Sequence, residues 1–309
     1  MTIKKQIKEI FYHLHNFGFS YTFSYVLSLL IKKRKYKTRK KAIKILEKNL
    51  GFIFENYKCV SDNNVNYTNI EKKFWLYWSQ GINKIPYVTK EVIARIRKFY
   101  PECEVIIIDD NNINNYLQID DNILKLYKQD KISIQTFSDI VRFNLLYKYG
   151  GVWVDSTLLF FERYPIFETI KDIGFYSLNV DCFEKNYIWK NVYPIKYTTF
   201  FLATCKGNQC MEACVNFYNC YYKKYNHAID YFMNDYILIL CMKYHLNNDC
   251  LNKIPFNAGN PFALVELIKN NSTNYSIIKN SPQKTNLRTT NEEKLKKILC
   301  EIDSNWRNI

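Results

Sequence analysis

The chain has 309 residues, of which 48% are hydrophobic and 17% aromatic. This content supplies ample apolar surface for a packed core and argues against intrinsic disorder. The 44 basic residues outnumber the 29 acidic ones, and the formal net charge of +15 favours anionic partners such as nucleic acid, an anionic membrane surface or phosphorylated ligands.

The first fifty residues are predicted to be helical and carry much of the positive charge. An apolar stretch at 17–31 runs into a basic run at 32–41 and is too short for a membrane span. The charges follow the apolar stretch and no small-residue cleavage site is evident, so a signal peptide is not favoured. Two interpretations remain open: a segment lying in an anionic membrane interface, or a helical hairpin packed on the main domain with a solvated basic face.

A polar, turn-rich stretch at 61–69 predicts a linker. We therefore expect a helical, basic and possibly membrane-associating region over residues 1–69 and a main domain over residues 70–309. The ten cysteines are scattered without a C-x-x-C motif, and no secretory signal is evident, so a reducing cytoplasmic location is expected.

The main domain opens with a strand, a helix and a second strand. The apolar segment 73–78 predicts the first strand, a helix follows Pro86, and 103–108 predicts the next strand, which ends at two aspartates. This order indicates the start of an α/β nucleotide-binding sheet. No G-x-G-x-x-G or P-loop motif occurs, so dinucleotide and ATP chemistry lack their usual sequence marks.

The densest chemical pattern begins in a predicted helix over residues 134–149. Its side chains are apolar almost all round, except for a narrow polar stripe that includes Asp139 and Arg142. These two lie three residues apart and share a face. Because a charged pair on a buried helix is costly unless it is paired or bound, the pair is either a structural ion pair or part of a ligand site.

A two-glycine break and a short strand follow this helix. Gly150 suits a left-handed helix cap, and the apolar strand 152–154 ends at Asp155. Ligands of open α/β sheets bind at that end of the strands. Gly150-Gly151 could be only a helix stop and Asp155 a loop cap, but the joint order of these features within about twenty residues favours a binding site.

Two strands and two helices are predicted after this segment. The strands cover 174–178 and 199–203, and the helices cover 207–224 and 228–245. Asp230 and Asp235 on the last helix could be carboxylates of a ligand site, although solvation on the helix surface is the favoured interpretation for each.

A family resemblance rests on the central segment. The chain reads Ser138-Asp139-Ile-Val-Arg142, then Tyr147-Lys-Tyr-Gly150-Gly151, then Val152-Trp-Val-Asp155-Ser156-Thr157. This order resembles nucleotide-sugar-dependent glycosyltransferases of the GT-A fold, and most of all bacterial capsular polysaccharide synthesis proteins related to glycosyltransferase family 32. The resemblance covers residues 70–290. It implies an α/β fold with a GT-A-like, Rossmann-type mixed sheet flanked by helices and a helical N-terminal extension.

The resemblance also implies a role for each matching residue. Asp139, Arg142 and Asp155 would be the catalytic residues, with Asp139 and Arg142 on the donor's sugar hydroxyls and phosphate. Trp78 would stack on the nucleotide base, and the two glycines would let the backbone approach the nucleotide. The implied donor site comprises Trp78, Asp139, Arg142, Gly150, Gly151, Asp155 and Lys284.

The chain departs from the family pattern at the metal. Asp155 and Thr157 stand at the Asp-x-Asp positions, so one carboxylate and a neutral hydroxyl would have to hold Mn²⁺ or Mg²⁺, which they bind less tightly than two carboxylates do. The late histidine common in family 32 is also missing, and Lys284 could neutralise the diphosphate directly.

The expected function is transfer of a sugar, with retention, from a nucleotide-sugar donor, in first place a UDP-sugar. The acceptor would be a growing capsular polysaccharide or lipopolysaccharide, as a glycan or a lipid-linked glycan. The enzyme would act in the cytoplasm, peripheral on the inner face of the cell membrane, with an anionic membrane surface as partner. One alternative is a catalytically inactive GT-A-like binding protein. A nucleic-acid-binding protein is disfavoured, because the basic charge is concentrated in one N-terminal run.

Overall fold

The computed structural model describes residues 3–31, 35–57, 67, 70–179, 197–255, 257–278, 281–287 and 290–306. Within these residues a five-stranded sheet forms the centre of the molecule, in the order β2-β1-β3-β6-β5. Strand β1 pairs in parallel with β2 and β3, whereas β6 is antiparallel to both β3 and β5. The sheet is therefore mixed, as expected. Its strands are β1 (Lys73–Tyr77), β2 (Glu104–Ile108), β3 (Gly151–Val154), β5 (Phe175–Ser177) and β6 (Phe201–Thr204).

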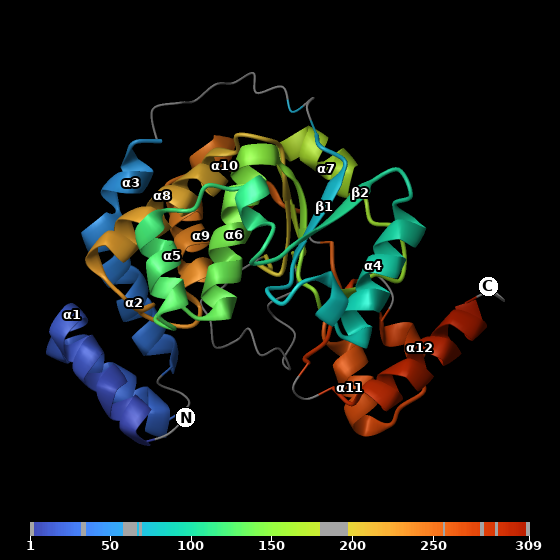
Figure 1. Ribbon diagram of the computed structural model, residues 1–309, viewed down its shortest axis with the longest axis horizontal. Helices are drawn as coiled ribbons and strands as arrows, with labels where there is room; N and C mark the ends of the chain where they lie inside the picture. Colours follow the sequence, from blue (N-terminus) through green and yellow to red (C-terminus); the bar gives the residue numbers. More distant parts are fainter. Residues whose placement is uncertain are drawn as a thin grey trace.

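The strands are apolar on both faces because helices cover both faces. On β3, Trp153 lies in one core and its neighbour Val152 in the other. The first core is shared with α5 (Asp121–Lys128), α6 (Ile134–Tyr149), α8 (Gln209–Lys224), α9 (Met233–Lys243) and α10 (Leu246–Lys253), as Figure 1 shows. The second is shared with α4 (Tyr87–Phe99), α7 (Ile166–Ile173), α11 (Ala263–Asn270) and α12 (Glu292–Trp306).

The N-terminal helices pack on the first core. They are α1 (Ile3–Leu30), α2 (Lys35–Leu50) and α3 (Phe52–Glu55), and they contribute buried Tyr21, Leu46 and Phe54 to that core. Helix α1 is kinked at Gly18, whose φ of 78° and ψ of 169° are not helical. No helix among the residues described here is both long enough and apolar enough to cross a bilayer. The helical hairpin predicted as one alternative is confirmed.

A small second sheet brings the end of the chain to the main sheet. Its strands β4 (Leu158–Leu159) and β7 (Gln283–Lys284) are antiparallel, with Leu158 opposite Lys284. Three short 3₁₀ helices, η2 (Ile82–Lys84), η3 (Ile113–Asn115) and η5 (Tyr275–Ile278), lie in connections. The β4–β7 pairing places Lys284 close to the end of β3.

Most predicted elements agree with the structure, but the helix predicted over 228–245 is wrong at its start. Helix α9 begins at Met233. The residues before it form turns, because Asp230 Oδ1 accepts a hydrogen bond from the Phe232 backbone N–H at 2.9 Å. Aspartate commonly stabilises such turns in competition with helix.

Candidate functional site

Asp155 lies directly after β3, where its carboxylate receives three donors. Its Oδ1 accepts hydrogen bonds from Arg142 Nη2 and from Trp153 Nε1, each at 2.9 Å. Its Oδ2 accepts one from Lys284 Nζ at 2.6 Å. Both oxygens are therefore engaged by cationic side chains.

Helix α6 presents Arg142 and Asp139 to the end of β3. Arg142 Nη1 lies 3.1 Å from Asp139 Oδ1, so one guanidinium contacts two carboxylates. The same guanidinium lies over the ring of Trp153, 5.0 Å from its centroid. Asp139, Arg142, Asp155 and Lys284 thus form a line of alternating charge, which we call the charged row. The structure thus brings Asp139, Arg142 and Asp155 together, and their catalytic and donor-binding roles stay predictions.

Lys284 lies 129 residues after Asp155 in the chain. Backbone hydrogen bonds bring it to the charged row. The backbone oxygen of Thr157 accepts hydrogen bonds from Thr285 N at 2.9 Å and from Thr285 Oγ1 at 3.1 Å. These bonds extend the β4–β7 pairing and fix Lys284 beside Asp155. Thr157 thus contributes to the site through its backbone oxygen.

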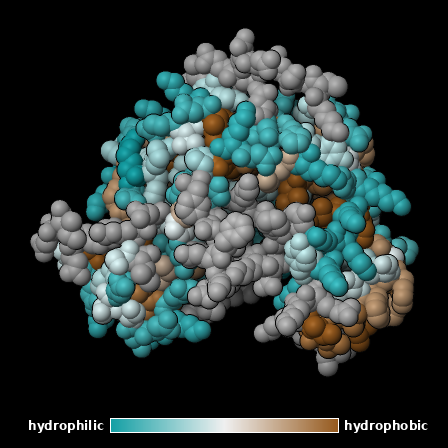
Figure 2. Space-filling model, turned by 180° about the vertical axis from the view of Figure 1, so that it is seen from behind, coloured by the Kyte–Doolittle hydropathy of each residue, from teal (hydrophilic) through white to brown (hydrophobic). Residues whose placement is uncertain are grey.

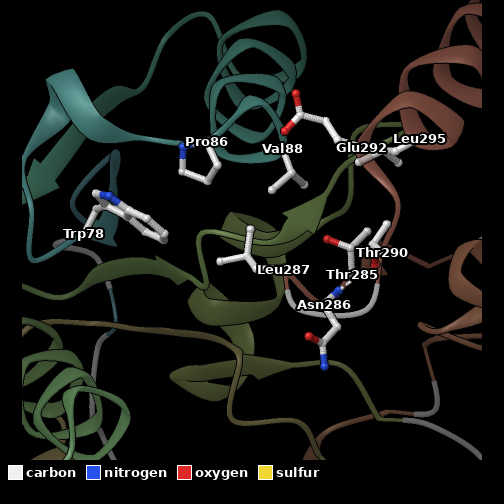
Figure 3. A pocket seen from close by; sticks show the side chains of 9 residues that line it. All are labelled: Trp78, Pro86, Val88, Thr285, Asn286, Leu287, Thr290, Glu292 and Leu295. Atoms are coloured by element: carbon white, nitrogen blue, oxygen red, sulfur yellow. Dashed lines mark hydrogen bonds between the residues drawn. The ribbon is translucent and has the colours of Figure 1, made fainter.

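A cavity of about 320 Å³ lies beside the segment that follows Lys284. Trp78 and Pro86 line one end of it, and Glu292 and Leu295 line the other (Figure 3). The indole of Trp78 is held in place, because its Nε1 donates to the Lys84 backbone oxygen at 3.1 Å. The lining includes Thr285, the chain neighbour of Lys284, but none of the four residues of the charged row.

The pKa values of the two carboxyl groups in the charged row shift in opposite directions. Burial would raise the pKa of Asp155, but the charges of Lys284 and Arg142 outweigh burial and hold that pKa below its ordinary value. For Asp139, burial outweighs the charge of Arg142, and the pKa rises to about 7. Asp155 is therefore a fixed negative charge at neutral pH, whereas Asp139 can retain a proton there.

Helix α9 adds two polar residues to the site. Sequence analysis did not single out Asn234 and interpreted Asp235 as a surface residue. Asn234 Nδ2 donates to Asp139 Oδ1 at 3.1 Å and to Thr199 Oγ1 at 3.2 Å. The favoured interpretation of Asp235 as a solvated surface residue is wrong, because it is 3% exposed. Burial and the charge of Asp139 raise the pKa of Asp235 to about 7. The sequence did not predict the burial of Asn234 and Asp235, because the start of their helix was misplaced.

Gly150 and Gly151 lie at the opposite end of β3 from Asp155. A Cβ on Gly150 would stand 2.6 Å from the backbone nitrogen of Lys206, and one on Gly151 would stand 2.7 Å from the backbone oxygen of Lys73. Both residues have positive φ, 71° and 87°. The structure therefore gives both glycines a packing role and does not bring them to the charged row. Their contact with a nucleotide stays a prediction.

The groups around Asp155 do not fit a divalent cation. Both oxygens of Asp155 already face cations, and Thr157, which is 7% exposed, supplies only a neutral hydroxyl. Among the residues described, no three carboxylate, histidine or cysteine side chains come together as a metal site would require. The metal roles of Asp155 and Thr157 rest on the resemblance alone.

The fold and the site define an α/β protein whose mixed sheet carries paired carboxylates and cations at a strand end, where such proteins bind ligands. A model of the capsular polysaccharide synthesis protein family matches residues 24–299. The chain belongs to this family.

Two curated relatives are fungal enzymes. The chain is 24% identical over 134 residues to the glycosyltransferase afumC of Aspergillus fumigatus, a match that covers 40% of this chain and 33% of that protein. It is 26% identical over 104 residues to the O-glycosyltransferase braB of Annulohypoxylon truncatum, which covers 30% of this chain and 24% of that protein. The chain thus spans a third or less of the length of either relative. The expected bacterial origin stays a prediction.

A structural comparison reaches further along the chain at lower similarity. The PaToxG glycosyltransferase aligns with 88% of this chain and 96% of its own, at 14% identity and a TM-score of 0.38. A TM-score at this level carries no argument about function. The GT-A assignment therefore stays a proposal.

Proposed function

We propose that the protein is a glycosyltransferase of GT-A type that moves a hexose from a UDP-sugar to a growing surface glycan. The observation that carries the proposal is the charged row, which sits at a strand end and whose Lys284 directly precedes Thr285 in the lining of the Trp78 cavity. Membership of the capsular polysaccharide synthesis family supports it. The names of both fungal relatives, each a glycosyltransferase, support it as well.

The charged row suits departure of a nucleoside diphosphate. The bond between the anomeric carbon and the diphosphate oxygen breaks, and a bond to an acceptor hydroxyl oxygen forms as that hydroxyl passes its proton to the departing diphosphate. Negative charge grows on the diphosphate, and Lys284 and Arg142 would stabilise it. The Nε of Arg142 is buried without a hydrogen-bond partner among the described side chains, so a phosphate oxygen would satisfy a costly donor.

The positions proposed for the base and the donor sugar follow the order of the side chains along the charged row. The base would stack on Trp78 in the cavity, and the donor sugar would lie against Asp139. Transfer with retention is proposed from the resemblance. Retaining transfer of this kind needs no general base supplied by the protein beside the acceptor.

A donor screen tests the proposal. UDP-, GDP- and TDP-sugars are offered with and without Mn²⁺, with binding measured by calorimetry and turnover by release of nucleotide. We expect a UDP-sugar to bind and be cleaved, with binding weakened about tenfold or more by Trp78→Ala or by Asp155→Asn. Asp172→Asn, an exposed carboxylate on α7, is the control and should match wild type. Failure of every nucleotide-sugar to bind would refute the proposal.

A catalytically inactive binding protein is the second candidate, and Thr157 is the observation that favours it. A neutral residue at this position and the absence of a metal-ligating set among the described residues would suit a protein that holds a nucleotide-sugar without cleaving it. Binding without nucleotide release, in the presence or absence of Mn²⁺, would establish this candidate over the first.

The proposed location is the cytoplasmic face of the membrane. On the described part of α1, seven large apolar side chains lie 42–78% exposed, namely Ile7, Phe11, Leu14, Phe19, Phe23, Leu29 and Leu30. Figure 2 shows hydrophobic surface gathered at its lower right, where α1 lies. Helix α2 beside it exposes Lys37, Lys40, Lys44 and Lys48 at helical spacing. Apolar side chains next to lysines suit a bilayer with anionic headgroups.

A further inference from the structure

The first turn of α9 is tied to the charged row. Asn234 bonds to Asp139 and Thr199 through its Nδ2, and its Oδ1 accepts a hydrogen bond from the Asp235 backbone N–H at 2.8 Å. The orientation of this amide is therefore fixed. It holds the segment Tyr231–Asp235 beside Asp139, at one end of the charged row.

Tyr231 in this segment is an aromatic side chain with no core to fill. It is 73% exposed, and its ring meets that of Phe232 edge to face, with centroids 5.1 Å apart. Phe232 in turn lies under the guanidinium of Arg39, at 4.2 Å. Partial desolvation, and then the charges of Asp139 and Asp155, raise the pKa of the Tyr231 hydroxyl. In the chain, Tyr231 lies three residues before Asn234, which contacts Asp139. Tyr231 is therefore a supported, solvent-facing ring at the edge of the site.

Asp235 lies four residues further on and is nine-tenths buried. Its Oδ1 has no hydrogen-bond partner among the described residues. A buried carboxyl oxygen without a partner is costly, and a bound hydroxyl group would satisfy it. The segment thus offers a flat apolar ring and a hydrogen-bonding carboxyl group. A pyranose has an apolar face that fits such a ring and hydroxyl groups that can bond to such a carboxyl group.

We propose that Tyr231 and Asp235 form the acceptor-sugar subsite, with the Tyr231 ring against the apolar face of the sugar and Asp235 bonded to one of its hydroxyls. This inference rests on the proposed function. The order of contacts supports it: Lys284 pairs with Asp155, Asp155 with Arg142 and Arg142 with Asp139. Asp139 in turn accepts a hydrogen bond from Asn234 of the segment, whereas Thr285 of the Trp78 cavity follows Lys284 at the other end. A donor laid out from base to sugar along this order ends at Asp139, where an acceptor hydroxyl must arrive.

The test separates the acceptor from the donor. A panel of methyl hexosides serves as acceptor probes, and nucleotide release from a UDP-sugar is measured with and without them. Tyr231→Ala should raise the glycoside concentration for half-maximal stimulation about tenfold, in line with loss of one aromatic contact. It should leave hydrolysis of the donor by water unchanged. Tyr231→Trp should restore stimulation, and Phe52→Ala, an exposed aromatic on α3, should match wild type.

Direct binding keeps the inference testable even if the chain cleaves no donor. Saturation-transfer NMR of the same methyl hexosides is recorded with wild type and with Tyr231→Ala. We expect binding to wild type and its loss in the variant. Equal glycoside binding or equal stimulation in the two proteins overturns the subsite and leaves the donor proposal standing. Absence of binding and stimulation by the whole panel overturns it as well.

Discussion

Arg142 connects the candidate site because its guanidinium reaches two carboxylates at once. It bonds to Asp139 from the same helix and to Asp155 from the end of β3, while its plane lies over Trp153. A lysine could not do this, because an ammonium group is compact and cannot present a planar fork to two partners. The sequence showed Arg142 on the correct face, and the structure adds the contact with Asp155 that turns three separate features into one site.

The two carboxyl groups with raised pKa give the protein a testable pH dependence. In the folded state Asp139 and Asp235 each have a pKa of about 7, and in the unfolded state such groups lose their protons near pH 4. Between these values the folded state binds more protons, so the free energy of unfolding falls as pH rises from 4 to 7 and is level above that. Because the two groups interact, they titrate as a pair.

We expect Asp235→Asn to remove much of this fall. Each unit of pKa shift corresponds to about 1.4 kcal/mol, so the variant should gain on the order of 2–4 kcal/mol relative to wild type between pH 5 and pH 8. Urea unfolding at several pH values measures the difference. Asp172→Asn is the exposed control and should keep the slope of wild type. Parallel curves for wild type and Asp235→Asn would contradict the buried-pair interpretation.

At the scale of elements, the junction of α6 and β3 sets the position of Asp155. The helix ends at Tyr149, and Gly150 turns the chain with φ 71° and ψ −155° into a strand that pairs with β1 and β6. The backbone oxygen of Gly150 also accepts a hydrogen bond from Trp75 Nε1 at 2.8 Å. Backbone atoms of β6 and of the residues after it pack so close that no side chain fits.

Gly150→Ala should therefore destabilise the protein strongly. The new methyl group would meet backbone atoms that cannot move aside, and the dihedral angles are open only to glycine. We expect a loss of about 3 kcal/mol or more in the free energy of unfolding. Gly207→Ala is the matched control, since Gly207 also has positive φ but nothing within 4 Å of its Cβ position, and should cost about 1–2 kcal/mol. A stable Gly150→Ala variant that loses donor binding would instead favour the predicted contact with a nucleotide.

Local sequence patterns predicted the elements around the site but not all of its partners. Strands β1 and β3 and helices α4 and α6 were predicted because apolar periodicity and the proline and glycine stops act within a few residues. The resemblance, and no local pattern, pointed to Lys284. Its ion pair with Asp155 depends on the β4–β7 pairing, which joins segments more than a hundred residues apart. Asp235 was misjudged because burial depends on how α9 packs and not on its own composition.

At the scale of the whole molecule, the N-terminal helices pack on the core and leave apolar side chains exposed on their outer side. Helices α1 to α3 pack on the core through Tyr21, Leu46 and Phe54, so they form the predicted hairpin. Their outer side nevertheless exposes the apolar stripe of α1 beside the lysines of α2. A soluble surface rarely leaves so many large apolar side chains together, and such patches mark sites of interaction.

We therefore expect the full chain to bind anionic vesicles through α1. Phe19 and Phe23 lie 74% and 54% exposed after the kink, with their rings stacked 5.9 Å apart. Burying a phenylalanine side chain contributes about 1.5–3 kcal/mol, so Phe19→Glu combined with Phe23→Glu should weaken binding by about a hundredfold or more. Flotation with vesicles of phosphatidylcholine and phosphatidylglycerol measures it, and Phe52→Glu on α3 is the control.

The lysines of α2 make the same binding sensitive to charge. Raising the salt concentration, or combining Lys37→Glu with Lys44→Glu, should weaken flotation on anionic vesicles, because screening and charge reversal remove the attraction to the headgroups. Binding to neutral phosphatidylcholine vesicles should be weak in every variant. If the double phenylalanine variant still floats like wild type, α1 is not the membrane contact. If the wild-type chain ignores vesicles but binds DNA or RNA with strong salt dependence, the basic surface serves nucleic acid and the membrane proposal is wrong.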